Sequence, residues 1–306
     1  MSRSVRAAVP HMAEVADGVH AYVQPDGGWC LNNAGLVVGD GGESLLVDTA
    51  ATELRARLLR TRVLRRSGAP PRTLVNTHFH GDHTFGNAHF PEALIVAHEH
   101  TRTEMAAAGL HLTGLWPDVR WGDLELTLPQ LTYRDSLTLH VGGVRVELIQ
   151  LGPAHTTADT AVWLPDRRVL FTGDLVMSGV TPFCLMGSVS GSLRAMRRLR
   201  ALGAETVVPG HGPVGGPELI DANEAYFRWL HEQARRGVAD GLTPLRLARE
   251  CRRGPFDHLL DSERLVPNLH RGYAEVRGAA PGSPLDVGAL FKEMSVFHGG
   301  LPDCHA

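Results

Sequence analysis

The first third of the chain alternates short apolar runs with turn residues. Apolar or alternating runs between turn residues are typical of strands. Such runs predict strands at residues 19–23, 34–38, 45–48, 73–76 and 94–97. The turn Gly39-Asp40-Gly41-Gly42 predicts a hairpin between the second and third of these strands. Leucines recurring among arginines predict an amphipathic helix over residues 53–66, and a second helix is expected to end at Ala108.

The same alternation returns in the second half of the chain. Two hairpins are predicted, from residues 137–141 with 144–151 and from residues 161–164 with 169–171. A helix over residues 192–202 and a strand over 206–208 follow. After Pro217 the pattern becomes mainly helical, most clearly at residues 225–236. Residues 109–134 between the halves predict a long loop with little regular structure, of the kind that often forms a functional lid.

This order of elements predicts an α/β (α+β) protein in which two sheet-plus-helix layers stack face to face. No Ser/Gly/Pro-rich linker separates the helical tail from the rest of the chain. We therefore expect one domain over residues 1–215 and a mainly helical C-terminal extension over residues 216–306 that packs on it.

Composition narrows the function classes. The chain has 306 residues, 43% of them hydrophobic, and a net charge of −3, which argues against a charge-driven nucleic-acid binder. The scattered cysteines, the N-terminal residues without an apolar run and the absence of about 18 consecutive apolar residues favour a cytoplasmic protein without a membrane span. Lys292 is the single lysine, so amine chemistry has one candidate, whereas the 17 histidines suggest metal binding.

The densest chemical signal is the string Thr77-His78-Phe79-His80-Gly81-Asp82-His83. His78 and His80 follow a predicted strand two positions apart, so in extended chain they project to one side. Asp82 and His83 come at the turn into the next segment. Imidazole and carboxylate groups suit zinc or a similar divalent metal, and the string predicts a metal site.

Three further ligand-type residues follow predicted strands: His155, Asp174 and His211. Each comes after an apolar run and small residues, and loops at strand ends are where such a fold builds its site. A single histidine in this position is usually an ordinary loop residue. Together with the first string, however, the set contains five histidines and two aspartates, which is enough for two metal ions.

The seven residues resemble, in order and spacing, the full motif set of the metallo-β-lactamase superfamily. The resemblance implies a four-layer αββα sandwich with a dinuclear site between the sheets, in a catalytic domain over residues 1–215. It implies His78, His80 and His155 on one ion, Asp82, His83 and His211 on the other, and Asp174 as the bridge. The ions are expected to be Zn²⁺, with manganese or iron as alternatives.

Two aspartates refine the resemblance. Asp48 resembles a structural aspartate beside the site, although a capping or turn role is equally compatible with its sequence context. Asp174 departs from the true β-lactamases and resembles the glyoxalase II, lactonase and thioesterase branches. A metal can lower the pKa of bound water to about 7, and Asp82 is the candidate catalytic residue that orients the resulting hydroxide.

A finer resemblance is to the metallo-β-lactamase-like cyclase/thioesterases of bacterial aromatic polyketide pathways. It is carried by residues 27–35, 113–117, 173–183 and 216–223. It implies an aromatic polyketide thioester on an acyl carrier protein, with ring closure or thioester hydrolysis through metal-bound hydroxide. Neither a nucleic acid nor a membrane is expected as a partner.

The apolar residues near the metal motifs predict a substrate pocket. The candidate pocket residues are Trp29, Trp116, Met177, Phe183 and Met186. Ordinary core packing is the competing interpretation for each. Rival functions are a lactonase, a glyoxalase II-like thioester hydrolase and a metal-binding protein without catalysis.

Overall fold

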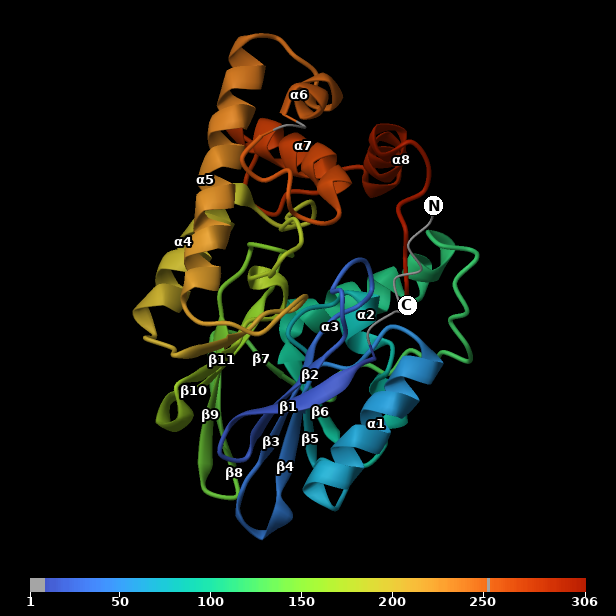
Figure 1. Ribbon diagram of the computed structural model, residues 1–306, viewed down its shortest axis with the longest axis vertical. Helices are drawn as coiled ribbons and strands as arrows, with labels where there is room; N and C mark the ends of the chain where they lie inside the picture. Colours follow the sequence, from blue (N-terminus) through green and yellow to red (C-terminus); the bar gives the residue numbers. More distant parts are fainter. Residues whose placement is uncertain (1–8, 252–253) are drawn as a thin grey trace.

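Two mixed sheets form the centre of the protein in the computed structural model, which describes residues 9–251 and 254–306 (Figure 1). In the first sheet the spatial order of the strands equals their chain order, antiparallel from β1 to β4 and parallel from β4 to β7. Its strands are β1 (His11–Ala16), β2 (Val19–Val23), β3 (Ala34–Val38), β4 (Ser44–Val47), β5 (Thr73–Val75), β6 (Leu94–His98) and β7 (Leu131–Tyr133).

The second sheet has the order β12-β11-β10-β9-β8. Only the β11–β12 pair is parallel among its described pairs. Its strands are β8 (Ser136–Val141), β9 (Val144–Gln150), β10 (Thr160–Leu164), β11 (Val169–Phe171) and β12 (Thr206–Val208).

Side-chain alternation along the strands separates three hydrophobic layers. Leu45 and Val47 of β4 face the core between the sheets, where they join Val162 and Leu164 of β10. Leu46, between the first two, packs on the outer face against the helix α1 (Glu53–Ser67). Alternate residues of a strand point to opposite faces, so each central strand contributes to two layers. This arrangement is the predicted αββα sandwich.

Helices cover the outer faces and extend the fold at the C-terminal end (Figure 1). The helix α3 (Glu99–Ala108) packs beside β6 and β7, and α4 (Val189–Ala201) covers the second sheet. The extension contains α5 (Glu218–Ala239), α6 (Pro244–Cys251), α7 (Leu265–Val276) and α8 (Val287–His298), which share a core of their own. No described helix is long and apolar enough to traverse a bilayer.

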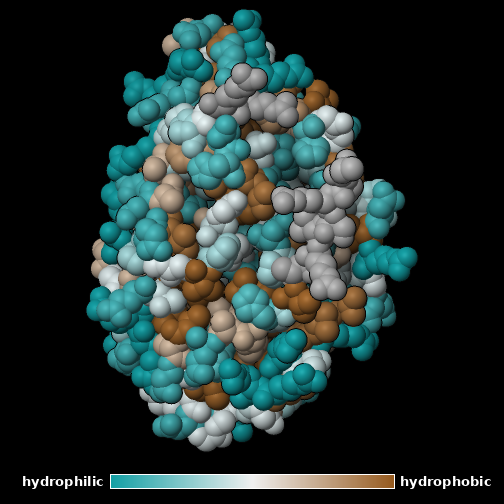
Figure 2. Space-filling view, in the orientation of Figure 1, coloured by the Kyte–Doolittle hydropathy of each residue, from teal (hydrophilic) through white to brown (hydrophobic). Residues whose placement is uncertain are grey.

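The surface reflects these layers. On the face seen in Figure 1, hydrophobic side chains gather in the band between the extension and the sheets, and hydrophilic ones cover both ends (Figure 2). The C-terminal tail returns to this band: Trp116 Nε1 donates to the Pro302 carbonyl at 2.7 Å, and Arg55 donates to the carbonyl of His305.

Most predicted elements are confirmed, and three differ. The strand β1 was not predicted, because its side chains are exposed or half-buried and give little hydrophobic contrast. The expected loop over residues 109–134 contains the short strand β7 at its end, as well as a 3₁₀ turn at His111–Gly114. The helix predicted at residues 192–202 begins at Val189, because the Ser188 hydroxyl accepts a hydrogen bond from the Gly191 amide and caps it.

The packing of α5 on α7 generates a stability prediction. An added Cβ at Gly237 would lie 1.8 Å from the Tyr273 hydroxyl and 2.6 Å from Leu247 Cδ2. Replacing glycine by alanine inside a helix normally gains about 1 kcal/mol, but overpacking costs about 1–3 kcal/mol. Gly237→Ala is therefore expected to lower the free energy of unfolding, measured by urea denaturation. Arg235→Ala, at an exposed position of the same helix, is the control and should leave it unchanged. A Gly237→Ala protein as stable as the wild type would contradict this packing.

Candidate metal centre

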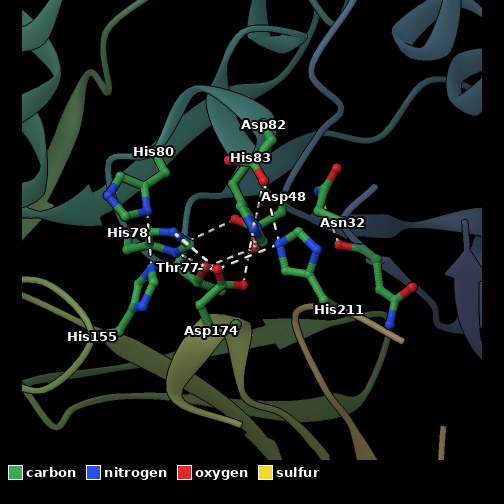
Figure 3. A network of polar contacts seen from close by, with 12 residues as sticks. Asn32, Asp48, Thr77, His78, His80, Asp82, His83, His155, Asp174 and His211 are labelled. Atoms are coloured by element: carbon green, nitrogen blue, oxygen red, sulfur yellow. Dashed lines mark hydrogen bonds and ion pairs between the residues drawn. The ribbon is translucent and has the colours of Figure 1, made fainter. Parts of the chain in front are cut away.

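Four loops at one edge of the sandwich deliver the predicted ligands. They follow β5, β9, β11 and β12 and carry, respectively, the 78–83 string, His155, Asp174 and His211. The parallel strands β11 and β12 end at the same edge, which places Asp174 beside His211. All seven predicted ligands converge there (Figure 3).

The seven side chains form two groups. In the first, ligand atoms of His78, His80, His155 and Asp174 all lie within 4.8 Å of one another, and in the second the same holds for Asp82, His83 and His211. Asp174 faces both groups, because Oδ2 lies 3.3 Å from His155 Nε2 and Oδ1 lies 3.0 Å from His83 Nε2. This placement matches the division of ligands that the family resemblance implies.

A second ring of acceptors fixes the orientation of the histidines. Asp48 Oδ2 lies 2.8 Å from His83 Nδ1, the carbonyl of Phe183 lies 2.7 Å from His155 Nδ1, and that of Gly27 lies 3.0 Å from His211 Nδ1. Such partners turn the other ring nitrogen, Nε2, toward the centre, as is usual for metal-binding histidines.

Asp48 has a structural role beside the site, and its positive φ of 59° also places it in a tight turn after β4. Its carboxylate also accepts from the Thr77 amide at 2.8 Å and from the Thr77 hydroxyl at 2.7 Å. Asp48 is 2% exposed, so these three contacts account for a buried charge. They connect the start of the ligand string to its last member, His83.

The donor set fits divalent metal ions. Among the described residues, His78 Nε2, His83 Nε2 and Asp174 Oδ1 are buried polar atoms that make no hydrogen bond, although the last two face each other at 3.0 Å. Buried polar atoms without partners cost free energy, and all three of these atoms point into one cluster. Imidazole nitrogen and carboxylate oxygen are donors that zinc and similar ions accept. Bound cations would satisfy the three atoms together.

The electrostatics of the cluster prepare two of its donors, His80 and Asp82, whereas the Asp174 carboxylate, against the effect of burial, raises the pKa of His83 and brings that of His211 to about 9. Burial lowers the pKa of His80 to about 3, so this imidazole is neutral. Burial alone would raise the pKa of Asp82, yet the neighbouring His83 and His211 hold it at about 2. Metal ligands must be neutral imidazoles or ionised carboxylates, and these two side chains already have that form at neutral pH.

A cavity opens over the ligands. All five predicted pocket residues line it, together with ligands from both groups: Trp29, Trp116, Met177, Phe183, Met186, His80, Asp82, His155, Asp174 and His211. That these five contact substrate stays a prediction.

Sequence reasoning missed several of the residues that line this cavity. They are Arg264, Val287 and Phe291. Arg264, Val287 and Phe291 belong to the C-terminal extension, whose apolar and charged positions are equally compatible with ordinary helix packing. Nothing in the spacing of these three residues along the sequence indicates that they lie near the metal ligands.

Comparison with known proteins gives the family. Residues 27–211 match the model of the metallo-beta-lactamase superfamily. A metallo-beta-lactamase type 2 of Bacteroides fragilis is 24% identical over 69% of this chain and 82% of that protein. A hydroxyacylglutathione hydrolase of Rhodospirillum rubrum is 28% identical over 60% of this chain and 67% of that protein.

A solved structure, a metallo-beta-lactamase from Pontibacter korlensis, is similar in fold, with a TM-score of 0.59. It is 20% identical in sequence, and the match covers 72% of this chain and 99% of that one. The matched family model spans more than half of the 306 residues. The chain therefore belongs to the metallo-β-lactamase superfamily, as a hydrolase with His and Asp metal-binding groups.

Proposed function

We propose that this hydrolase is a dinuclear thioesterase-cyclase that acts on an aromatic polyketide thioester held by an acyl carrier protein. The observation that carries the proposal is the aromatic wall of the cavity over the ligand cluster. A flat, uncharged acyl group placed against this wall would have its carbonyl next to both ligand groups.

The wall is built from three aromatic side chains, of which Trp29 contacts the other two. The ring of Trp29 lies 5.4 Å from that of Trp116 in a tilted arrangement and 5.5 Å from that of Phe183, edge to face. Met177 and Met186 complete the apolar lining, and thioether side chains adapt to irregular apolar shapes. Aromatic surfaces of this kind favour aryl groups over polar ones.

The charges in the cavity support the same substrate class. Arg264 is the one arginine or lysine among the described residues that line the cavity. Its guanidinium pairs with Asp261 at 2.8 Å and donates to the Thr181 carbonyl at 3.1 Å, so it is already engaged. A thioester whose thiol part carries several carboxylates would therefore find no unpaired arginine or lysine among the described residues of this lining. A neutral aryl thioester needs no such partner.

The ligand cluster suits the chemistry that the proposal requires. His78, His80, His155 and Asp174 would hold one ion, and Asp82, His83 and His211 would hold the other, with Asp174 between them. When bound, such ions supply a Lewis acid that polarises a carbonyl and stabilises negative charge on oxygen. Both thioester hydrolysis and aldol-type ring closure develop such charge.

We assign to Asp82 the role of accepting a proton from the attacking water. It lines the cavity, and its Oδ2 lies 3.3 Å from His211 Nε2. Its other oxygen, Oδ1, is left to orient an attacking water and to hold a proton of that water. The apolar wall limits the entry of other water molecules, which would compete with ring closure.

The similarity to a hydroxyacylglutathione hydrolase supports thioester hydrolysis as the reaction type. It also makes a glyoxalase II-like hydrolase the second candidate function. The two candidates differ in the acyl group and in the thiol carrier, so a panel of substrates separates them.

Substrate preference tests the proposal directly. The metal-loaded protein is expected to show a kcat/KM for the 2-naphthoyl thioester of N-acetylcysteamine at least about 10-fold above that for S-lactoylglutathione, because only the aryl group contacts the aromatic wall. An acyl homoserine lactone is the third substrate, and hydrolysis is followed by thiol release and mass spectrometry. Turnover of the lactone alone would refute the thioesterase. Full metal content without turnover of any substrate would identify a non-catalytic metal-binding protein.

Metal content tests the ligand assignment. His80→Ala and Asp82→Ala each remove one donor and are expected to lose bound metal and thioester hydrolysis together, measured by elemental analysis and kinetics. His140→Ala, on the exposed face of β8, is the matched control and should retain both. Treatment of the wild type with a chelator should abolish hydrolysis, and added Zn²⁺ or Mn²⁺ should restore it. A His80→Ala protein with the metal content of the wild type would sink the assignment.

A further inference from the structure

Two consecutive residues of the extension, Glu263 and Arg264, lie against Trp29. Glu263 and Trp29 are 234 positions apart in the chain. Glu263 and Arg264 form the end of a short 3₁₀ turn, Ser262–Arg264, before α7. Glu263 Oε1 accepts a hydrogen bond from Trp29 Nε1 at 2.6 Å, and Arg264 Cζ lies 4.1 Å from the centre of the Trp29 ring. Both residues lie beyond the segment that matches the family model, which ends at residue 211.

The charges of both residues are buried and fixed. Glu263 is 3% exposed and Arg264 is 2% exposed, so each needs partners. The Asp261 carboxylate and the Thr181 carbonyl hold the guanidinium of Arg264. The second oxygen of Glu263, Oε2, lies 3.4 Å from Nδ1 of His298, at the end of α8. Both side chains are therefore held by other parts of the molecule, independently of Trp29.

The indole of Trp29, by contrast, sits on a loop that gives it little support. Within the loop, the Leu31 amide donates to the Gly28 carbonyl at 3.0 Å, and the Gly27 carbonyl lies beside His211 Nδ1. These contacts fix the backbone next to a metal ligand but do not orient the side chain of Trp29, whose ring also packs on Trp116 and Phe183. The hydrogen bond to Glu263 fixes the edge of the indole, and the stacked guanidinium of Arg264 fixes its plane.

The extension also anchors the second tryptophan of the wall. The Trp116 indole nitrogen donates to the carbonyl of Pro302 at 2.7 Å, in the tail after α8. Two tryptophans from different loops of the sandwich are thus each held by the same C-terminal extension.

We infer that Glu263 and Arg264 are positioning residues that hold the Trp29 indole as an aryl-binding wall, so that the extension sets a preference for flat aromatic acyl groups. The substrate class in this inference rests on the proposed function. The positioning of Trp29 does not, because it concerns binding of an aryl group and requires no turnover.

The test compares two carboxylate probes on the metal-loaded protein, 2-naphthoate and octanoate, by titration calorimetry. Both carry the same carboxylate, so contacts with the metal site cancel in the ratio of their dissociation constants. Glu263→Ala is expected to weaken naphthoate binding by about 3- to 10-fold, the range of one aromatic contact, and to leave octanoate binding unchanged. Glu263→Gln keeps an acceptor for Trp29 Nε1 and should restore most of the loss.

A double-mutant cycle shows whether the effect passes through Trp29. Trp29→Leu alone should lose the naphthoate preference, and adding Glu263→Ala to it should cause no further loss. Arg264→Lys keeps the charge but lacks the planar group, so it should weaken naphthoate selectively. Arg277→Gln is the matched control, because Arg277 lies 5.4 Å over the Tyr273 ring in the same extension but does not line the cavity.

Kinetics separate this inference from the proposed function. With naphthoyl and octanoyl thioesters of N-acetylcysteamine, Glu263→Ala should raise KM for the naphthoyl substrate without lowering kcat. A wild type that binds naphthoate selectively but hydrolyses no thioester would refute the proposed function and leave the positioning role standing. Equal binding of naphthoate by Glu263→Ala and wild type would overturn the inference. An equal loss for both probes, or additive losses in the cycle, would overturn it as well.

Discussion

The carboxylate of Asp174, buried between two groups of histidines, is the constraint on which the rest of the structure depends. Its two oxygens face His83 and His155, which reach it from different loops. Such a cluster forms only where strand ends from both sheets meet closely. Within the second sheet, the ends of β11 and β12 are so close that a Cβ added at Gly210 would lie 1.9 Å from Asp174 Oδ1. Gly173, with φ +49°, allows the chain to turn sharply before Asp174. A Cβ added at Gly173 would lie 2.5 Å from the Thr77 hydroxyl oxygen.

The acceptors around the cluster extend this constraint into the fold. Asp48 ties the end of β4 to Thr77 and His83, and the Phe183 and Gly27 carbonyls tie two further loops to His155 and His211. Because Phe183 and Trp29 belong to these same loops, the position of the metal ligands and the shape of the cavity wall are linked. A shift of the wall would also move the carbonyl groups that orient His155 and His211.

The sequence predicts the sandwich, and it singles out the seven side chains that converge at one edge of it, because both depend on local signals. Residues 19–23, 34–38 and 206–208 are strands in the structure as predicted, since each is a short apolar run bounded by turn residues. The β1 and β7 strands escaped prediction because most of their side chains are exposed or half-buried, so the hydrophobic contrast along each strand is weak. The role of Asp48 stayed open in the sequence because its partners, Thr77 and His83, are defined by the fold. Glu263 and Arg264 are polar residues in a helical tail, so the sequence gives no reason to expect them to be buried. Their contacts with Trp29, which is far away in the sequence, appear only in the folded structure.

The metal ligands and the residues that support the cavity wall lie on different parts of the chain, and this separation has a functional consequence. The ligands and their acceptors lie on the sandwich, within the segment that matches the superfamily model. The residues that hold Trp29 and Trp116 lie on the extension, outside that segment. Metal chemistry demands ligand positions accurate to a fraction of an ångström, whereas an apolar wall tolerates different side chains and different supports. If the proposed function holds, a change in the extension can therefore alter which acyl group is accepted while the ligand cluster keeps its geometry. The same ligand set in a chain without this extension would lack the contacts of Glu263 and Arg264 with Trp29, and the proposed aryl preference would then depend on the loop alone.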